Sequence, residues 1–240
     1  MAPTNTTEKP ISRARTLLIF VSTILIGFVL FALPNVFFGV SKFNGGLIGV
    51  NLLWMALFQL VTVLLLLYYS LRLLNKDFRF IGLVSTAWKS DSVVGLLTGL
   101  AWTALQFGWI IPNTGGSARE DIAQGVAMMD GTLLGMLSYL TLGIIGGGIT
   151  EEIYNRGYFI TVLQDTFKRP QVGLWFASVL SIVFFALGHL PGSALDWFDI
   201  LVPTVAYTIL FLLTRRLTAS IVAHSTYNAT AILLTYYLYY

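Results

Sequence analysis

Residues 132–159 of this chain read TLLGMLSYLTLGIIGGGITEEIYNRGYF. The first half of this stretch is almost entirely apolar, as in a helix that crosses a lipid bilayer. Three glycines then lead into two adjacent glutamates, Glu151 and Glu152, and into Arg156. Carboxylates are costly inside hydrocarbon and are tolerated there only when specific partners stabilise them. The stretch therefore predicts a membrane helix that carries a polar site.

The rest of the sequence has the composition of a membrane protein. Of its 240 residues, 56% are hydrophobic and 10% are charged, with a mean hydropathy of +0.79, whereas soluble domains carry about 25% charged residues. We predict an all-α, polytopic transmembrane helix bundle of about seven spans, with eight as the alternative count. The predicted spans are 17–38, 47–74, 92–111, 132–150, 172–190, 198–213 and 217–240.

The chain is predicted to contain a single integral membrane domain, residues 16–240, preceded by a disordered cytoplasmic tail, residues 1–15. Between the second and third spans, residues 76–91 repeat large apolar side chains at helical spacing. This pattern is typical of a helix that lies in the membrane interface, and a polar loop is the alternative. In the third span, Gly95 and Gly99 form a G-x-x-x-G pattern that permits close approach of another helix.

Basic residues gather at alternate ends of the predicted spans. The connections after the first, third and fifth spans contain only Lys42 and Arg119, while the N-terminal segment and the other connections are richer in Lys and Arg. The positive-inside rule therefore places the N-terminus in the cytoplasm. We expect a multi-pass integral membrane protein, in contact with lipid. Because its basic residues follow the span ends, the net charge of +3 does not indicate nucleic-acid binding.

Ionisable residues stand in three of the apolar segments. The only two histidines are His189, at the end of the fifth predicted span, and His224, within the seventh. Glu152 and Arg156 are four residues apart, so they share a helix face and are able to pair. Glu151 is turned by about 100° from Glu152 around a helix, which leaves it free to face a cavity. These five ionisable residues lie on three predicted helices, and such a number inside a membrane favours a functional site.

His224 and Asn228 are also four residues apart and would present two polar groups on one face of the last helix. A carboxylate in a low-dielectric site acts as a general base toward water, and imidazole and amide N–H groups stabilise an oxyanion. A second chemistry fits the same residues, in which Glu151, His189 and His224 hold Zn²⁺ beside an open water position. Both chemistries predict hydrolysis of an amide or ester. The absence of Cys excludes thiol nucleophiles and thiolate metal sites.

Three short motifs resemble those of the CAAX-protease and bacteriocin-processing family, also called CPBP or Abi. They are Glu151-Glu152-x-x-x-Arg156, Phe185-x-x-x-His189 and His224-x-x-x-Asn228, in the order that the family has. The resemblance implies an all-helical intramembrane endopeptidase with its catalytic part in residues 132–240 and a site that opens toward the cytoplasm. It further implies that Glu151 and His189 activate water, that His224 and Asn228 stabilise the oxyanion, and that Glu152 and Arg156 shape the site.

The predicted function is hydrolysis of a peptide bond in a membrane-associated protein or peptide, by a glutamate mechanism without a cofactor and with zinc as the alternative. The resemblance also implies a bacterial cell membrane as the location, and candidate roles there, because bacterial relatives are linked to bacteriocin maturation and self-immunity. One alternative function is a non-catalytic partner of another membrane protein, such as a sensor kinase. Another is a small transporter or immunity factor, which the lack of a visible internal repeat disfavours. No oligomeric state follows from the sequence.

Overall fold

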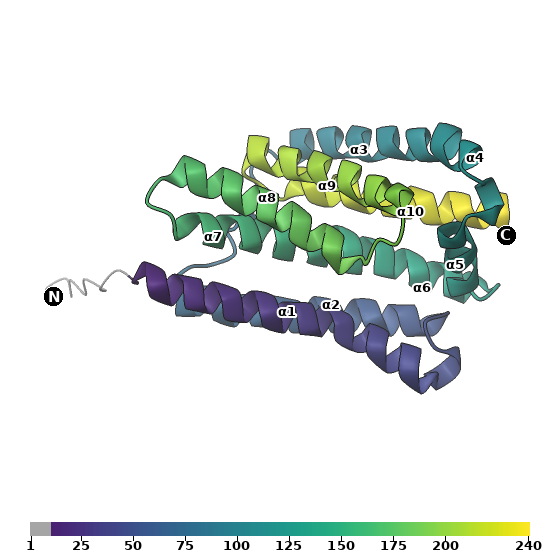
Figure 1. Ribbon diagram of the computed structural model, residues 1–240, viewed down its shortest axis with the longest axis horizontal. Helices are drawn as coiled ribbons and strands as arrows, with labels where there is room; N and C mark the ends of the chain where they lie inside the picture. The colour runs from purple at the N-terminus through teal and green to yellow at the C-terminus, as the bar shows by residue number, and fades with distance from the viewer. Residues whose placement is uncertain (1–10) are drawn as a thin grey trace, which may run out of the picture.

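The computed structural model describes residues 11–240, which form a bundle of long helices without a strand (Figure 1). The predicted all-α membrane bundle is thereby confirmed. Seven helical segments run along the bundle, and their order reproduces the order of the predicted spans. They are α1 (Arg13–Ser41), α2 (Val50–Leu73), α3 to α4 (Trp88–Asn113), α6 to α7 (Leu133–Asp165), α8 (Pro170–Gly188), α9 (Ala194–Thr214) and α10 (Thr218–Tyr239).

The fourth segment contains two unusual stretches of helix. It begins as α6 (Leu133–Thr141), continues as the π-helical stretches η4 (Leu142–Glu151) and η5 (Ile153–Ile160), and ends as α7 (Thr161–Asp165). π-Helical turns are rare and occur frequently at functional sites. Here they coincide with the glycines and glutamates that interrupt the apolar sequence.

Six of the seven segments are long and apolar enough to cross a membrane, among the residues that the structure describes. The remaining one is α10, the predicted span 217–240, whose Ser, Thr, His and Asn side chains make it less apolar. This helix packs against α3, α6, η4 and α9. Its polar side chains therefore meet protein rather than lipid, so that α10 completes the bundle without being apolar all round.

Residues 76–87 form turns, so the interfacial helix expected at 76–91 is wrong. Gly82 has a positive φ of 86°, which ends any regular helix, and its carbonyl accepts a hydrogen bond from the backbone N–H of Leu217. Ile81 is fully buried. The segment therefore packs against the turn between α9 and α10. Helix α3 begins only at Trp88.

The G-x-x-x-G pattern of α3 does bring two helices together, as its spacing predicts. A Cβ atom added to Gly95 would lie 2.5 Å from the carbonyl oxygen of Ala219, and one added to Gly99 would lie 2.6 Å from that of Ala223. Both acceptors belong to α10. Only glycine leaves room for this contact, and it holds α10 at the depth where its polar residues face the fourth segment.

The two ends of the bundle differ in charge. The start of α1, the α2–α3 connection, the α7–α8 turn and the α9–α10 turn all lie at one end, on the left in Figure 1, which we call the basic end. The opposite end, where α10 finishes, is called the distal end, and its only Lys and Arg among the described residues are Lys42 and Arg119. The basic end carries Arg13, Arg15, Arg72, Lys76, Arg79, Lys89, Lys168, Arg169, Arg215 and Arg216.

Little of the predicted tail, residues 1–15, lies within the described residues. Ser12 accepts a hydrogen bond from the backbone N–H of Arg15 at 3.3 Å, which caps α1. Helix α1 therefore begins at Arg13, three residues inside the range that was expected for the tail.

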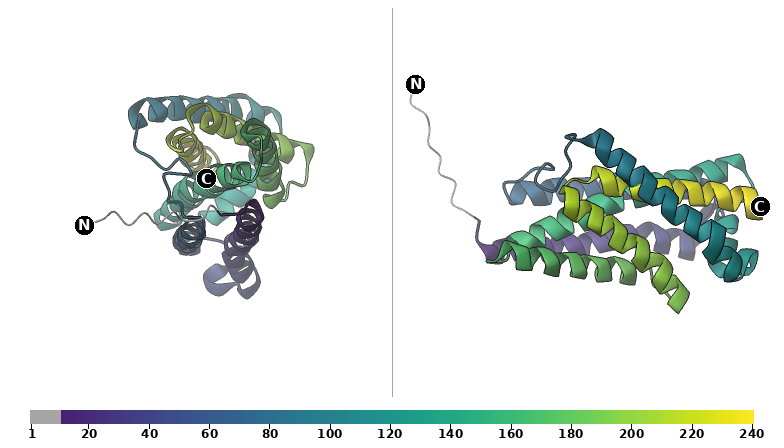
Figure 2. Two further views of the ribbon diagram at one scale, coloured as in Figure 1. Left: turned by 90° about the vertical axis from the view of Figure 1, so that its left-hand side faces the viewer. Right: turned by 90° about the horizontal axis from the view of Figure 1, so that it is seen from above.

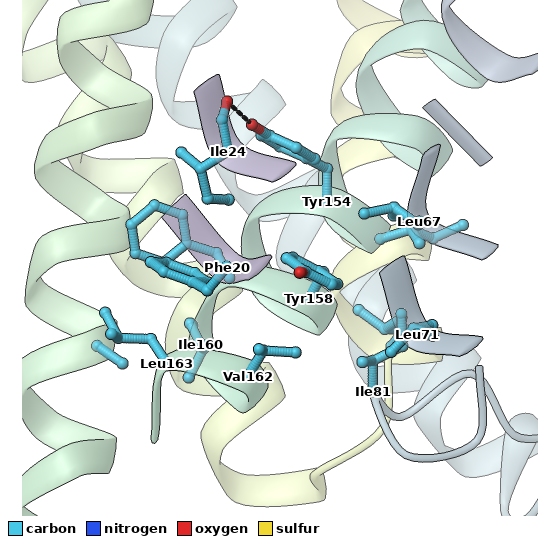
Figure 3. Packing of buried hydrophobic residues seen from close by; sticks show 14 of the residues in the cluster. Phe20, Ile24, Leu67, Leu71, Ile81, Tyr154, Tyr158, Ile160, Val162 and Leu163 are labelled. Atoms are coloured by element: carbon cyan, nitrogen blue, oxygen red, sulfur yellow. Dashed lines mark hydrogen bonds between the residues drawn. The ribbon is translucent and has the colours of Figure 1, made fainter. Parts of the chain in front are cut away.

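The largest apolar cluster fills the half of the bundle that is nearer to the basic end (Figure 3). Phe20 of α1, Leu67 of α2 and Tyr158 of η5 meet at its centre, and the hydroxyl of Tyr154 donates a hydrogen bond to the carbonyl of Ile24. Viewed along the bundle axis, α1 and α2 form a pair beside the remaining helices (Figure 2). The cluster joins this pair to the fourth segment.

Candidate active site

A cavity of about 750 Å³ lies between α1, α2, the fourth segment, α8 and α10. Four of the six predicted site residues line it, namely Glu151, His189, His224 and Asn228. Much of the remaining wall is apolar and includes aromatic side chains of α1 and α8. The structure thus brings together the three motifs that the sequence placed on three separate helices.

The two adjacent glutamates face different surroundings. Glu151 is partly exposed and lines the cavity, whereas Glu152 is fully buried. Oε1 of Glu152 lies 2.9 Å from Nη1 of Arg156, which confirms the predicted pair four residues apart. One carboxylate is thus neutralised inside the protein, while the other remains available to the cavity.

The guanidinium of Arg156 is enclosed on every side, since the residue is only 1% exposed. Its Cζ lies 4.5 Å from the ring centroid of Phe185 and 6.0 Å from that of Tyr207. A cation over an aromatic face is attracted by the ring quadrupole. The carboxylate of Glu152 and these two rings together explain how a buried charge is tolerated at this depth.

His224 is fixed by the same buried carboxylate. Its Nδ1 lies 2.9 Å from Oε1 of Glu152, and because an ionised carboxylate only accepts hydrogen bonds, Nδ1 must carry the proton. The imidazole also stacks on Tyr207, with ring centroids 5.0 Å apart and 24° between the planes. A Cβ atom added to Gly147 would lie 3.5 Å from Nε2 of His224. The second ring nitrogen therefore points into the space that Gly147 leaves open.

His189 lies at the end of α8 and is exposed. Its Nδ1 is 2.9 Å from the carbonyl oxygen of Phe185, four residues earlier. A carbonyl only accepts, so Nδ1–H is the donor, and in the neutral imidazole Nε2 keeps its lone pair. The spacing of the second motif thus has a structural reason, because the backbone carbonyl of Phe185 accepts the hydrogen bond that orients the imidazole of His189.

The amide of Asn228 is anchored to the fourth segment. Its Nδ2 donates a hydrogen bond to the carbonyl oxygen of Gly143 at 2.8 Å, which uses one of its two N–H groups. A Cβ atom on Gly147 would lie only 2.6 Å from that nitrogen. Glycine at position 147 therefore keeps open the space beside both Asn228 and His224.

Comparison with protein families matches residues 133–230 to the model described as type II CAAX prenyl endopeptidase Rce1-like. This region contains all six predicted site residues. Residues 133–230 form an Rce1-like domain. The resemblance to the CAAX-protease and bacteriocin-processing family is thereby confirmed. No curated protein and no solved structure matches the chain.

The alternative cofactor, a zinc ion, would need at least three ligands from side chains of the Rce1-like domain. Within residues 11–240, no three His, Asp or Glu side chains converge in a way that would hold a metal ion. Glu151, His189 and His224 line one cavity, but their side chains do not form such a group. Because the three side chains do not converge, this arrangement does not fit the zinc alternative.

Two residues of the site were missed by sequence reasoning. Tyr207 stacks on His224, but a tyrosine within an apolar span is too common to be a signal. Gly147 preserves space between the third and first motifs. The run of three glycines at 146–148 could have indicated it. Consecutive glycines weaken a helix, so their presence in a membrane span suggests that close contacts require them.

Proposed function

We propose that the protein is an intramembrane endopeptidase that hydrolyses a peptide bond in a membrane-associated protein or peptide. The observation that carries this proposal is the place of Glu151 in the Rce1-like domain. Its carboxylate lines the cavity together with two imidazoles and an amide. No basic side chain within residues 11–240 forms an ion pair with it, in contrast to Glu152.

Glu151 is proposed to act as the general base. A water molecule bound between its carboxylate and the bare Nε2 of His189 would give a proton to Glu151 as its oxygen attacks the peptide carbonyl carbon. The protonated Glu151 then returns this proton to the leaving nitrogen as the C–N bond breaks. One carboxylate thus serves as base and acid in turn, and the enzyme ends the cycle in its original protonation state.

Asn228 and His224 are proposed to stabilise the oxyanion that forms on the attacked carbonyl. Asn228 has one N–H that is not used by Gly143. His224 would donate from Nε2 in its protonated form, and Glu152 at Nδ1 is placed to stabilise that positive charge. Both donors are fixed before substrate binds, so little reorganisation is needed during the reaction.

The apolar wall of the cavity suits a substrate from the membrane. Such a wall displaces water and so strengthens the interaction between the donors and the oxyanion. A peptide matured at the membrane, such as a bacteriocin, belongs to the proposed substrate class, as does a peptide against which the protein protects its producer.

The proposal is tested by comparing the membrane proteomes of cells that carry the wild type, a deletion or Glu151→Gln. The amide of glutamine cannot take a proton from water, so the same cleavage products should be missing from the deletion and Glu151→Gln strains. Glu120→Gln is the matched control, because Glu120 is exposed at the distal end and accepts from Gln124. A deletion phenotype that Glu151→Gln rescues fully would instead show that the protein acts by binding.

A further inference from the structure

An apolar groove of about 430 Å³ lies along α2, near the basic end. Its wall contains Val61, Leu65 and Tyr68 of α2, each of which is about half exposed. Leu83 of the connection between α2 and α3 also lines it, and the buried Ile153 of η5 lies at its floor. No charged residue is among those that line the groove. Its surface therefore suits a hydrocarbon chain.

The groove has the length and the depth of part of one membrane leaflet. Val61 and Tyr68 are two helical turns apart, so the groove extends for about 10 Å along α2. Tyr68 lies less than two turns before Leu73, where α2 ends at the basic end. A hydrocarbon core about 30 Å thick leaves about 15 Å for each leaflet. A lipid chain that descends from the surface at the basic end would thus lie along the groove.

A more polar hollow of about 710 Å³ continues the groove toward the surface at the basic end. Leu83 lines both the groove and the hollow. Three hydroxyl side chains also line the hollow, and none of them has a hydrogen-bond partner within residues 11–240. These hydroxyls belong to Ser85, Thr86 and Thr218. The hollow thus offers several hydrogen-bond donors to a group that lies above the groove.

Arg79 supplies the positive charge of the hollow and has no acidic partner there. No carboxylate lines the hollow, and within residues 11–240 Arg79 forms no ion pair. Asp77 accepts hydrogen bonds from the backbone N–H groups of Arg79 and Phe80. Asp91, in the first turn of α3, is paired with Arg216 at 2.7 Å. The guanidinium of Arg79 is therefore available to an anion, which it would bind by charge-assisted hydrogen bonds.

Aromatic side chains place the hollow at the level of the lipid headgroups. Trp88 lines the hollow and is 55% exposed, and Tyr68 lines the groove. Trp and Tyr are enriched where hydrocarbon meets headgroups. Nζ of Lys89 lies 5.8 Å from the ring centroid of Trp88, which brings a second positive charge to the same place. Basic side chains at this level attract anionic lipids.

We propose that groove and hollow together bind one anionic glycerophospholipid from the leaflet at the basic end. An acyl chain lies in the groove and the phosphate lies in the hollow, against Arg79 and the three hydroxyls. The choice of an anionic headgroup follows from the charges, because Arg79 and Lys89 are both basic and no acidic side chain lines the hollow. The lining residues of this site and those of the cavity that contains Glu151 are different, so the proposal is independent of the proposed function.

Lipid binding to the purified full-length protein tests the site. The protein is mixed in detergent with equal amounts of phosphatidylglycerol or phosphatidylcholine that have identical acyl chains, and native mass spectrometry measures the bound lipid. Arg79→Gln removes the cation, and Arg13→Gln is its matched control, because Arg13 is exposed at the basic end but does not line the hollow. Leu65→Trp fills the groove, and Leu25→Trp is its control on an exposed face of α1.

We expect the wild type and Arg13→Gln to bind phosphatidylglycerol more tightly than phosphatidylcholine. Arg79→Gln should bind phosphatidylglycerol about fivefold more weakly, as for the loss of one basic side chain at an anionic surface. Leu65→Trp should bind both lipids more weakly than Leu25→Trp does.

Equal losses in Arg79→Gln and Arg13→Gln would overturn the headgroup site, since the attraction would then come from the overall charge of the basic end. Equal binding of the two lipids by the wild type would overturn it as well. If Leu65→Trp binds lipid as tightly as Leu25→Trp, the groove does not hold the acyl chain.

Discussion

Nδ1 of His224 lies 2.9 Å from Oε1 of Glu152, and the two residues are 72 positions apart in the sequence. The same oxygen lies 2.9 Å from Nη1 of Arg156. Glu152 therefore joins the first and third motifs of the Rce1-like domain inside the protein. It holds one cation in place and fixes the orientation of one imidazole, while Glu151 beside it remains directed at the cavity.

Arg156→Ala is expected to destabilise the protein strongly. Both members of the ion pair are buried, and removal of one leaves the other as an uncompensated charge, which typically costs about 3–5 kcal/mol. Thermal unfolding in detergent measures the effect. The double variant Arg156→Ala with Glu152→Gln should recover part of the lost stability, because it removes the uncompensated charge of Glu152. If Arg156→Ala unfolds at the same temperature as the wild type, the ion pair does not stabilise the protein.

Gly147→Ala is expected to impair proteolysis while Gly108→Ala does not. The new methyl group at position 147 would lie 2.6 Å from Nδ2 of Asn228, so that the proposed oxyanion donor must move. Gly108 is the matched control, since it also lies in a π-helical stretch, η2 (Gln106–Ile110), and an added Cβ there has no neighbour within 4 Å. Cleavage of an identified substrate by membranes of equal protein content is the measurement. If Gly147→Ala cleaves the substrate as fast as Gly108→Ala does, the space beside Asn228 is not needed for proteolysis.

Tyr207→Phe is expected to retain both activity and stability, whereas Tyr207→Ala loses activity. The ring of Tyr207 stacks on His224, but its buried hydroxyl has no hydrogen-bond partner among the described residues. Removal of an unsatisfied buried polar group costs little or stabilises, while loss of the ring removes the support of the imidazole. Activity and thermal unfolding are compared for the two variants. A large loss in Tyr207→Phe would show that the hydroxyl takes part in the reaction.

Proteolysis is expected to persist after treatment with a metal chelator. No three metal-binding side chains converge within residues 11–240, and the proposed base is a carboxylate. Purified protein is dialysed against EDTA and then assayed with and without added Zn²⁺. Activity that disappears on dialysis and returns specifically with Zn²⁺ would contradict the glutamate mechanism.

Much of the fold follows from local patterns in the sequence. The lengths of the apolar stretches indicate the long helices and their order, because a helix must span a fixed hydrocarbon thickness. The pairing of Glu152 with Arg156 follows from the helical repeat, which places residues four apart on one face. The segment at 76–91 shows the limit of such reasoning, since its helical spacing was overridden by the packing of Ile81 and Gly82 against the α9–α10 turn.

The class of the fold, the three motifs, the different directions of Glu151 and Glu152 and the pairing of Glu152 with Arg156 all follow from local sequence, because each depends on residues a few positions apart. The contact of His224 with Glu152 and the hydrogen bond from Asn228 to Gly143 depend instead on how the helices pack. The tertiary structure also decided that the cavity lies between α1, α2, the fourth segment, α8 and α10. These features arise from contacts between helices that are distant in the chain, and such contacts depend on how close and at what depth the helices pack, which no local periodicity encodes.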